Sequence, residues 1–86
     1  MALLLDIDLS ILGSPTRVFE QFDAEVRQEF DWVDEEMWRA GRGKVLQGFL
    51  ERPKIFQTPT FHQLLEAQAR ENLKRAVEKL SAPPER

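Results

Sequence analysis

The sequence lacks several residue types on which common catalytic and metal sites depend. It has no cysteine, which excludes disulfides, iron–sulfur clusters and thiolate zinc sites. His62 is its single histidine, so this chain alone cannot build a metal site from several histidines. No apolar run approaches the roughly 20 residues of a membrane-spanning helix, and Met1 does not open a secretory signal. We therefore expect a cytoplasmic protein that makes no contact with a membrane.

The sequence is also short, and this bounds the fold. Its 86 residues allow one small domain, with 42% apolar residues, 31% charged residues and a net charge of −3. A domain of this size buries only about 60% of the surface of its unfolded chain. Such a domain is marginally stable unless a partner or a metal supports it.

Glycine, proline and capping residues divide most of the chain into helical segments. The apolar spacing and the turn residues predict helices over residues 15–31, 35–51 and 59–80. Asp34 is the expected N-cap of the second helix, and Pro53 is expected to end it. Residues 1–80 thus form one predicted domain, followed by a frayed tail over residues 81–86.

The predicted core is drawn from the helices and from the linker before the last helix. Ile55 and Phe56 are expected to return to the core from this linker. Gly41 and Gly43 would suit the close approach of another backbone. The outer face of the last helix is expected to carry i, i+4 ion pairs, among them Glu66–Arg70. Its inward residues are predicted to be Phe61, Leu64, Leu65, Leu73, Ala76, Val77 and Leu80.

The opening segment, residues 3–12, has seven aliphatic residues in ten. Periodicity alone allows a helix or a strand, but a lone strand would have no partner in a helical chain, so we predict a helix. The fold class is therefore all-α with about four helices. An opening helix that is apolar nearly all round should be buried on every side. Three further helices are too few to surround it. The sequence therefore predicts either the later part of a larger domain or one half of a tight homo-oligomer, in which self-association completes the domain.

Asp6 and Asp8 lie within this aliphatic segment. Burial of an unpaired carboxylate is costly, so such a group normally finds a metal, a cation or hydrogen-bond donors. Both residues are therefore candidate metal ligands or nucleophiles. The alternative is that both lie at a solvated edge or help to end a short helix. The DIDLS string also resembles the first motif of haloacid-dehalogenase-type phosphatases, but no later segment predicts the parallel sheet of that family.

A longer resemblance covers most of the chain. Several blocks resemble, in order, the C-terminal half of the bacterial predicted metal-dependent HD-domain phosphohydrolases. These blocks are DIDLSILGSP (6–15), VRQEF (26–30), RAGR (39–42), VL (45–46), FLERPKIFQTP (49–59) and LEAQARENL (65–73).

The resemblance implies an all-helical fold and hydrolysis of a phosphorylated small molecule or nucleotide with a divalent metal (Mn, Mg, Fe or Zn). The family ligates its metal through a histidine, a His-Asp pair and a later aspartate. The later aspartate corresponds best to Asp8, and Asp6 is the second candidate. The upstream ligands have no counterpart here, and His62 lies outside any matching motif. The chain alone should therefore be inactive, with no catalytic residue of its own and too few ligands to hold a metal tightly.

The charges are distributed unevenly along the chain. Residues 14–36 carry a net charge of −6, whereas residues 37–56 carry +4. Arg39 and Arg42 in the basic stretch are weak candidates for a phosphate contact. The favoured interpretation is a solvated face that pairs with the acidic helix. Nucleic acid is not an expected partner, because the chain has no net positive charge. The alternative to an HD-type half-domain is a non-enzymatic helical oligomerisation or interaction module.

Overall fold

The computed structural model describes the backbone of residues 2–81 and the side chains of residues 6–81. This part of the chain contains no strand, which confirms the predicted all-α fold of about four helices. Ser81 belongs to the last helix rather than to a tail, and the rest of the predicted tail, residues 82–86, lies outside the described residues. The elements are α1 (Ala2–Leu9), the 3-10 helix η1 (Ser10–Gly13), α2 (Thr16–Glu29), α3 (Glu35–Leu50) and α4 (Pro59–Ser81).

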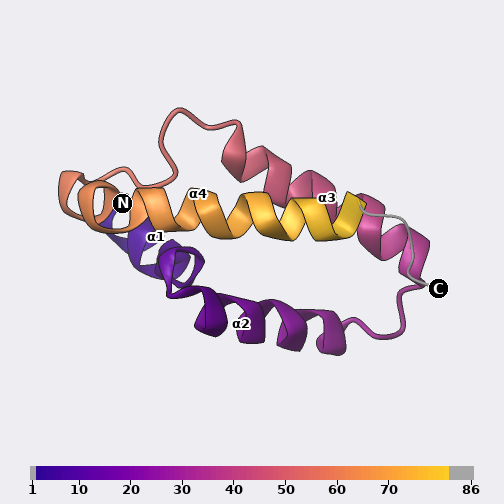
Figure 1. Ribbon diagram of the computed structural model, residues 1–86. Helices are drawn as coiled ribbons and strands as arrows, with labels where there is room; N and C mark the ends of the chain where they lie inside the picture. Colours follow the sequence, from indigo (N-terminus) through magenta and orange to yellow (C-terminus); the bar gives the residue numbers. More distant parts are fainter. Residues whose placement is uncertain (1, 82–86) are drawn as a thin grey trace.

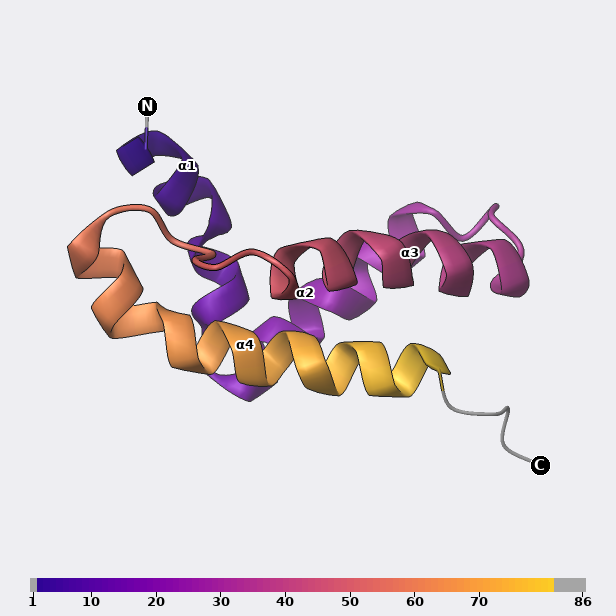
Figure 2. The ribbon, with the colours of Figure 1, turned by 90° about the horizontal axis from the view of Figure 1, so that it is seen from above.

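The longest helix, α4, runs along the molecule, which measures 43 × 22 × 21 Å. Helix α3 packs beside it, and η1 packs against it from the other side. Figure 1 shows α2 below α4 and α3 above it, with α1 at one end and the α2–α3 turn at the other. Figure 2, from above, places α1 beside the linker that leads into α4. The two ends of the molecule are thus built from different elements.

The C-terminal ends of α2, α3 and α4 are each bound by an arginine, because the last carbonyl groups of a helix lack partners inside it. Arg27 donates to the carbonyls of Phe30 (2.8 Å) and Val33 (3.1 Å) beyond α2. For the other helices the contacts are Arg70 to Leu50 O (2.9 Å) at α3, and Arg39 to Leu80 O (2.7 Å) at α4. At the other end of α3, the Asp34 carboxylate accepts from Met37 N at 2.9 Å, as its sequence context predicts. Three arginines from three different parts of the chain therefore each bind the end of a helix.

The hydrophobic core lies between η1, α2, α3 and α4. Ile55 and Phe56 are 1% and 0% exposed, which confirms that the linker returns to the core. Leu64 was expected to point inward but is 72% exposed, because the buried stripe of α4 passes through Glu66, about 200° around the helix from it. The remaining buried apolar residues are Leu12, Phe19, Leu46, Ala69, Leu73 and Ala76.

The opening helix is less buried than its composition suggests. Ile7 is 50% exposed and Asp8 is exposed, so burial on every side is wrong for these residues. The side chains of residues 3–5 lie outside the described part. Helix α1 packs against η1, and the described elements leave half of the Ile7 side chain exposed.

One glycine sets how closely η1 approaches α4. A Cβ atom at Gly13 would lie 2.7 Å from Leu65 Cβ and 2.9 Å from Leu65 O. Asn72 of α4 also binds the chain at η1, since its side-chain amide nitrogen donates to Leu12 O (2.9 Å) and Ser14 O (2.8 Å). The close approach expected at Gly41 and Gly43 is wrong, because nothing lies within 4 Å of a Cβ built at either position. Both lie on the outer part of α3.

Replacement of Gly13 by alanine should therefore destabilise the fold by about 1–3 kcal/mol, because the methyl group meets backbone of α4. The matched change Gly43→Ala should stabilise it by about 0.5–1 kcal/mol, because alanine favours an open helical position. Urea denaturation of the two variants measures both effects. Equal effects at the two positions would contradict the proposed close contact.

Candidate functional site

The Asp6 carboxylate is fully buried and bound by the linker between α3 and α4. Its Oδ1 accepts from Gln57 N (2.8 Å), and its Oδ2 accepts from Thr58 N (2.7 Å) and Thr58 Oγ1 (2.6 Å). Burial raises the pKa of Asp6, but these hydrogen bonds outweigh it and hold the pKa below its ordinary value of 3.8. Asp6 therefore lies as an anion beside Thr58, the residue before α4, where the helix dipole favours negative charge.

A second buried carboxylate, Glu66 on α4, binds the preceding part of the same linker. It accepts from Ile55 N (3.0 Å, Oε2) and Phe56 N (3.1 Å, Oε1). Four successive backbone N–H groups, residues 55–58, thus donate to two carboxylates, which we call the carboxylate clamp. The linker needs these acceptors, because it has no helical or sheet partner for its donors.

Arg70 completes the Glu66 half of the clamp. Its Nε donates to Glu66 Oε2 at 2.8 Å, and its Nη atoms reach the carbonyls of Leu50, Arg52 and Pro53. Burial raises the pKa of Glu66, but the two backbone donors and Arg70 outweigh it, so the pKa lies below the ordinary 4.5. His62 Nδ1 lies 3.2 Å from Glu66 Oε1. One ion pair therefore fixes both the end of α3 and the path of the linker.

The sequence places Glu66 and Arg70 on the outer face of α4, and this is wrong for Glu66, which is 8% exposed. The spacing does contain a signal. Glu66, Ala69, Leu73 and Ala76 follow the alternating three- and four-residue steps of a buried helical stripe, and all four are buried. A glutamate within such a stripe requires donors, and the linker supplies them.

The Asp8 side chain differs from that of Asp6 both in its exposure and in its hydrogen bonding. It is exposed, and it makes no hydrogen bond or ion pair with residues 2–81. The Asp6 carboxylate thus accepts three hydrogen bonds, whereas the Asp8 carboxylate keeps all of its acceptor positions open with respect to these residues. The described residues contain no group of three or more histidine, aspartate or glutamate side chains that could hold a metal ion.

Arg39 and Arg42, the candidate phosphate contacts, are engaged within the fold. Arg39 donates to Glu35 (3.0 Å) as well as to the end of α4. Arg42 pairs with Asp23 at 2.8 Å across the α2–α3 interface, as the pairing of basic and acidic stretches predicts. The guanidinium of Arg42 also lies 5.8 Å from the ring centre of Trp38.

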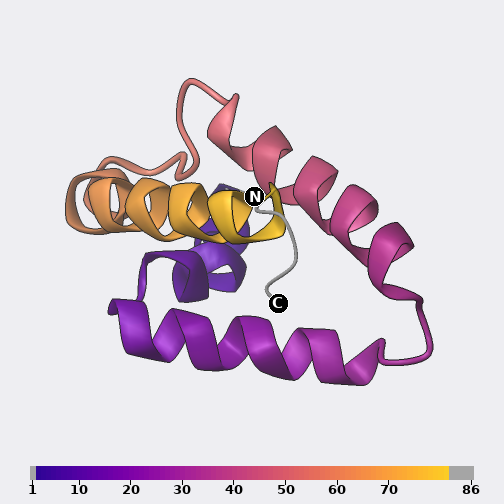
Figure 3. The same cartoon turned by 45° about the vertical axis from the view of Figure 1, so that its right-hand side comes forward.

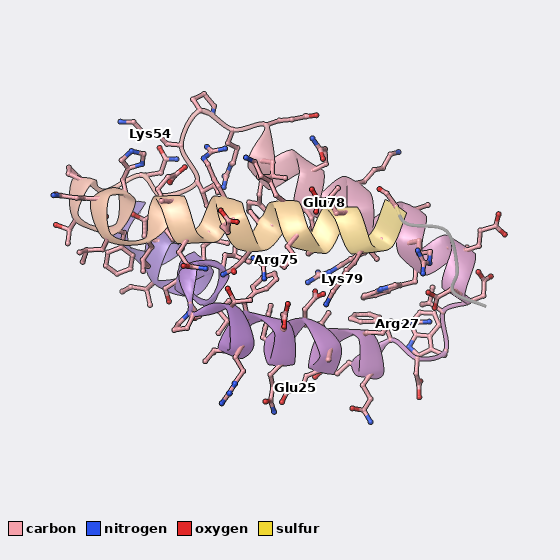
Figure 4. The ribbon with its side chains drawn as sticks, in the orientation of Figure 1. Glu25, Arg27, Lys54, Arg75, Glu78 and Lys79 are labelled. Carbon is pink, nitrogen blue, oxygen red and sulfur yellow. The ribbon has the colours of Figure 1, made fainter. Side chains whose placement is uncertain are left out.

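A groove of 310 Å³ lies between α2, α3 and α4. Figure 4 shows Arg75 and Lys79 on the side of α4 that faces α2, whereas Glu25 points away from α4. Lys79 lies 3.7 Å from Glu20 on the opposite wall. Because both acidic and basic residues line this groove, it favours neither an anionic nor a cationic ligand.

Comparison with known proteins does not place the chain in a family, because no protein-family model, curated protein or solved structure matches it. Among residues 2–81, none of the helices combines the length and the apolar character needed to cross a bilayer. The assignment of a function therefore depends on the residues themselves.

Removal of the Glu66 carboxylate should be costly. We expect Glu66→Ala to lower the free energy of unfolding by about 2–3 kcal/mol, because it leaves two linker N–H groups and the Arg70 charge without their acceptor. Glu71→Ala is the matched control on the same helix, since Glu71 is exposed and lies 3.8 Å from Arg75. It should cost at most about 0.5 kcal/mol. Similar losses in urea denaturation would show that the clamp does not support the fold.

The clamp also predicts how stability depends on pH. Because the pKa values of Asp6 and Glu66 are lower in the folded than in the unfolded chain, the unfolded state binds more protons in acid. Their contribution is complete above about pH 5 and is lost as the pH falls through the folded values. Urea midpoints measured between pH 7 and 3 should be flat and then decline, less steeply in Glu66→Gln. A midpoint that rises on acidification would contradict this.

Proposed function

We propose that this chain is the C-terminal half of a metal-dependent HD-type phosphohydrolase and that Asp8 is its metal ligand. Asp8 is favoured over Asp6 because the two carboxylates of α1 differ in their exposure and in their hydrogen-bond partners. Asp6 is held by Gln57 and Thr58, whereas Asp8 is exposed and has no partner among the described residues. The clamp holds α1 against the linker, which keeps the open carboxylate at the surface.

The described residues do not form a complete site for a divalent metal. A catalytic metal site generally needs about three protein ligands and an open position, and Asp8 supplies one. A histidine and a His-Asp pair from outside residues 2–81 would have to supply the rest. One carboxylate does not distinguish Mn, Mg, Fe and Zn, and we derive no catalytic step from this chain alone. The substrate class of the proposal is a phosphorylated small molecule or nucleotide in the cytoplasm.

Arg39 and Arg42 have no part in this proposal. Asp6 touches the residue before α4, while Arg39 binds the last turn of α4. The 23 residues of α4 separate these points by about 34 Å, at 1.5 Å per residue. Arginines at that distance cannot contact a phosphate bound at Asp8.

A second candidate function is a non-enzymatic module that self-associates through α1. The half-exposed Ile7 supports it, because an apolar side chain is left open to solvent next to the exposed Asp8. The same surface would be covered by the missing half of an HD domain. The two proposals therefore differ in what covers α1, another copy or a different segment.

The coding sequence upstream of the Met1 codon separates them. We expect it to encode, in frame, a histidine and a later His-Asp pair. The extended protein should then hydrolyse p-nitrophenyl phosphate in the presence of Mn²⁺. Asp8→Asn should lower this activity by at least about tenfold, because it removes a ligand, without a change in the urea midpoint.

Two further carboxylate variants, one at an exposed position of α4 and one in the clamp, serve as controls. Glu78→Gln, at an exposed position of α4, should leave the activity unchanged. Asp6→Asn should lower the urea midpoint, because it breaks the clamp. An upstream sequence without these ligands, or full activity in Asp8→Asn, would overturn the phosphohydrolase proposal.

A further inference from the structure

A second surface lies at the end of the molecule far from Asp8. A groove of 350 Å³ runs between the C-terminal part of α2 and the N-terminal half of α3. Its apolar walls include Val26, Phe30, Val33, Met37, Trp38 and Val45. Several of these apolar side chains are exposed to solvent: Met37 is 67% exposed, Val45 51% and Phe30 41%. Trp32, next to the groove in sequence, is 75% exposed.

The groove exists because α2 and α3 pack mainly on other elements. The principal contacts of α2 are with η1 and α4, and those of α3 are with α4. Figure 3 shows the two helices meeting at the turn and then diverging. Phe30 and Trp38 stack at 6.0 Å near the turn, and beyond them the apolar walls face no described segment. Clustered apolar side chains of this kind mark interaction sites.

The rim of the groove is acidic. Glu29, Asp31 and Glu36 are exposed sequence neighbours of the lining residues, and none of them forms an ion pair or side-chain hydrogen bond with residues 2–81. Asp34, also at this rim, accepts one backbone N–H and has no cationic partner there. On the basic side, Arg27 and Arg39 also adjoin lining residues, but both pair with Glu35, and the lining residue Arg42 pairs with Asp23. Lys44 is then the exposed base next to a lining residue among those described.

We propose that this groove binds an amphipathic α-helix of a partner protein, with large apolar side chains on one face and lysine or arginine on the other. A third helix laid between α2 and α3 would bury Met37 and Val45, and its basic residues would meet the acidic rim. A second copy of this chain is a poorer occupant, because two acidic rims would face each other. The proposal does not depend on the phosphohydrolase assignment, since Asp8 lies at the opposite end.

The test uses two synthetic 18-residue helical peptides that share one leucine face, with lysine or glutamate on the other face. Each is titrated into the full 86-residue chain and followed by the fluorescence of Trp32 and Trp38 and by calorimetry. We expect the lysine peptide to bind at least about tenfold more tightly at low salt than the glutamate peptide. Its affinity should fall in 0.5 M NaCl, because the rim charges are exposed and screened.

Variants locate the binding surface. The double change Met37→Asp and Val45→Asp should weaken the lysine peptide at least about tenfold, and circular dichroism should confirm that it folds, as both positions are exposed. Leu64→Asp is the matched control, because Leu64 is equally exposed but lies near the start of α4. Equal binding of both peptides, or equal loss in both variants, would overturn the proposal. So would a dimer in sedimentation that the double variant converts to a monomer, since a second copy would then fill the groove.

Discussion

Four consecutive backbone N–H groups of the linker donate to two carboxylates that come from opposite ends of the sequence. The linker has no regular structure of its own, and an unsatisfied buried N–H group costs free energy comparable to a lost hydrogen bond. Asp6 and Glu66 remove that cost, and in doing so they join α1, the linker and α4. Ile55 and Phe56 can enter the core because their backbone N–H groups donate to the Glu66 carboxylate. The orientation of α1, and with it the exposure of Asp8, follows from the same contacts.

Much of the charge in this small domain has a structural use. Arg27, Arg39 and Arg70 each bind the carbonyl end of a different helix, and Arg42 joins α2 to α3 through Asp23. Arg39 and Arg42, the two candidate phosphate contacts of the basic stretch, are therefore engaged within the fold. The charges that remain without partners are informative for that reason. Among them are Asp8 at one end of α4 and the acidic residues beside the α2–α3 groove at the other end.

The helices were predictable because each carries its own local signals. Asp34 caps α3, and Thr58-Pro59 marks the start of α4. The return of Ile55 and Phe56 to the core was predictable from their hydrophobicity. The partners of Asp6 were not, because they lie 51 and 52 positions along the chain and no local pattern joins them. The close contact between Gly13 and Leu65 was not predicted for a similar reason, since it is tertiary. The close approach expected at Gly41 and Gly43 rested only on their position in a helix.

Native-state hydrogen exchange of the linker amides tests the carboxylate clamp most directly. If the clamp holds the linker, the amides of residues 55–58 should exchange nearly as slowly as those in the middle of α4, because they open only when the fold opens. The amide of Lys54, which has no acceptor among the described residues, should exchange quickly and serve as the internal reference. Exchange of residues 55–58 at the rate of Lys54 would show that the linker opens independently, and the account of how α1 presents Asp8 would then fail.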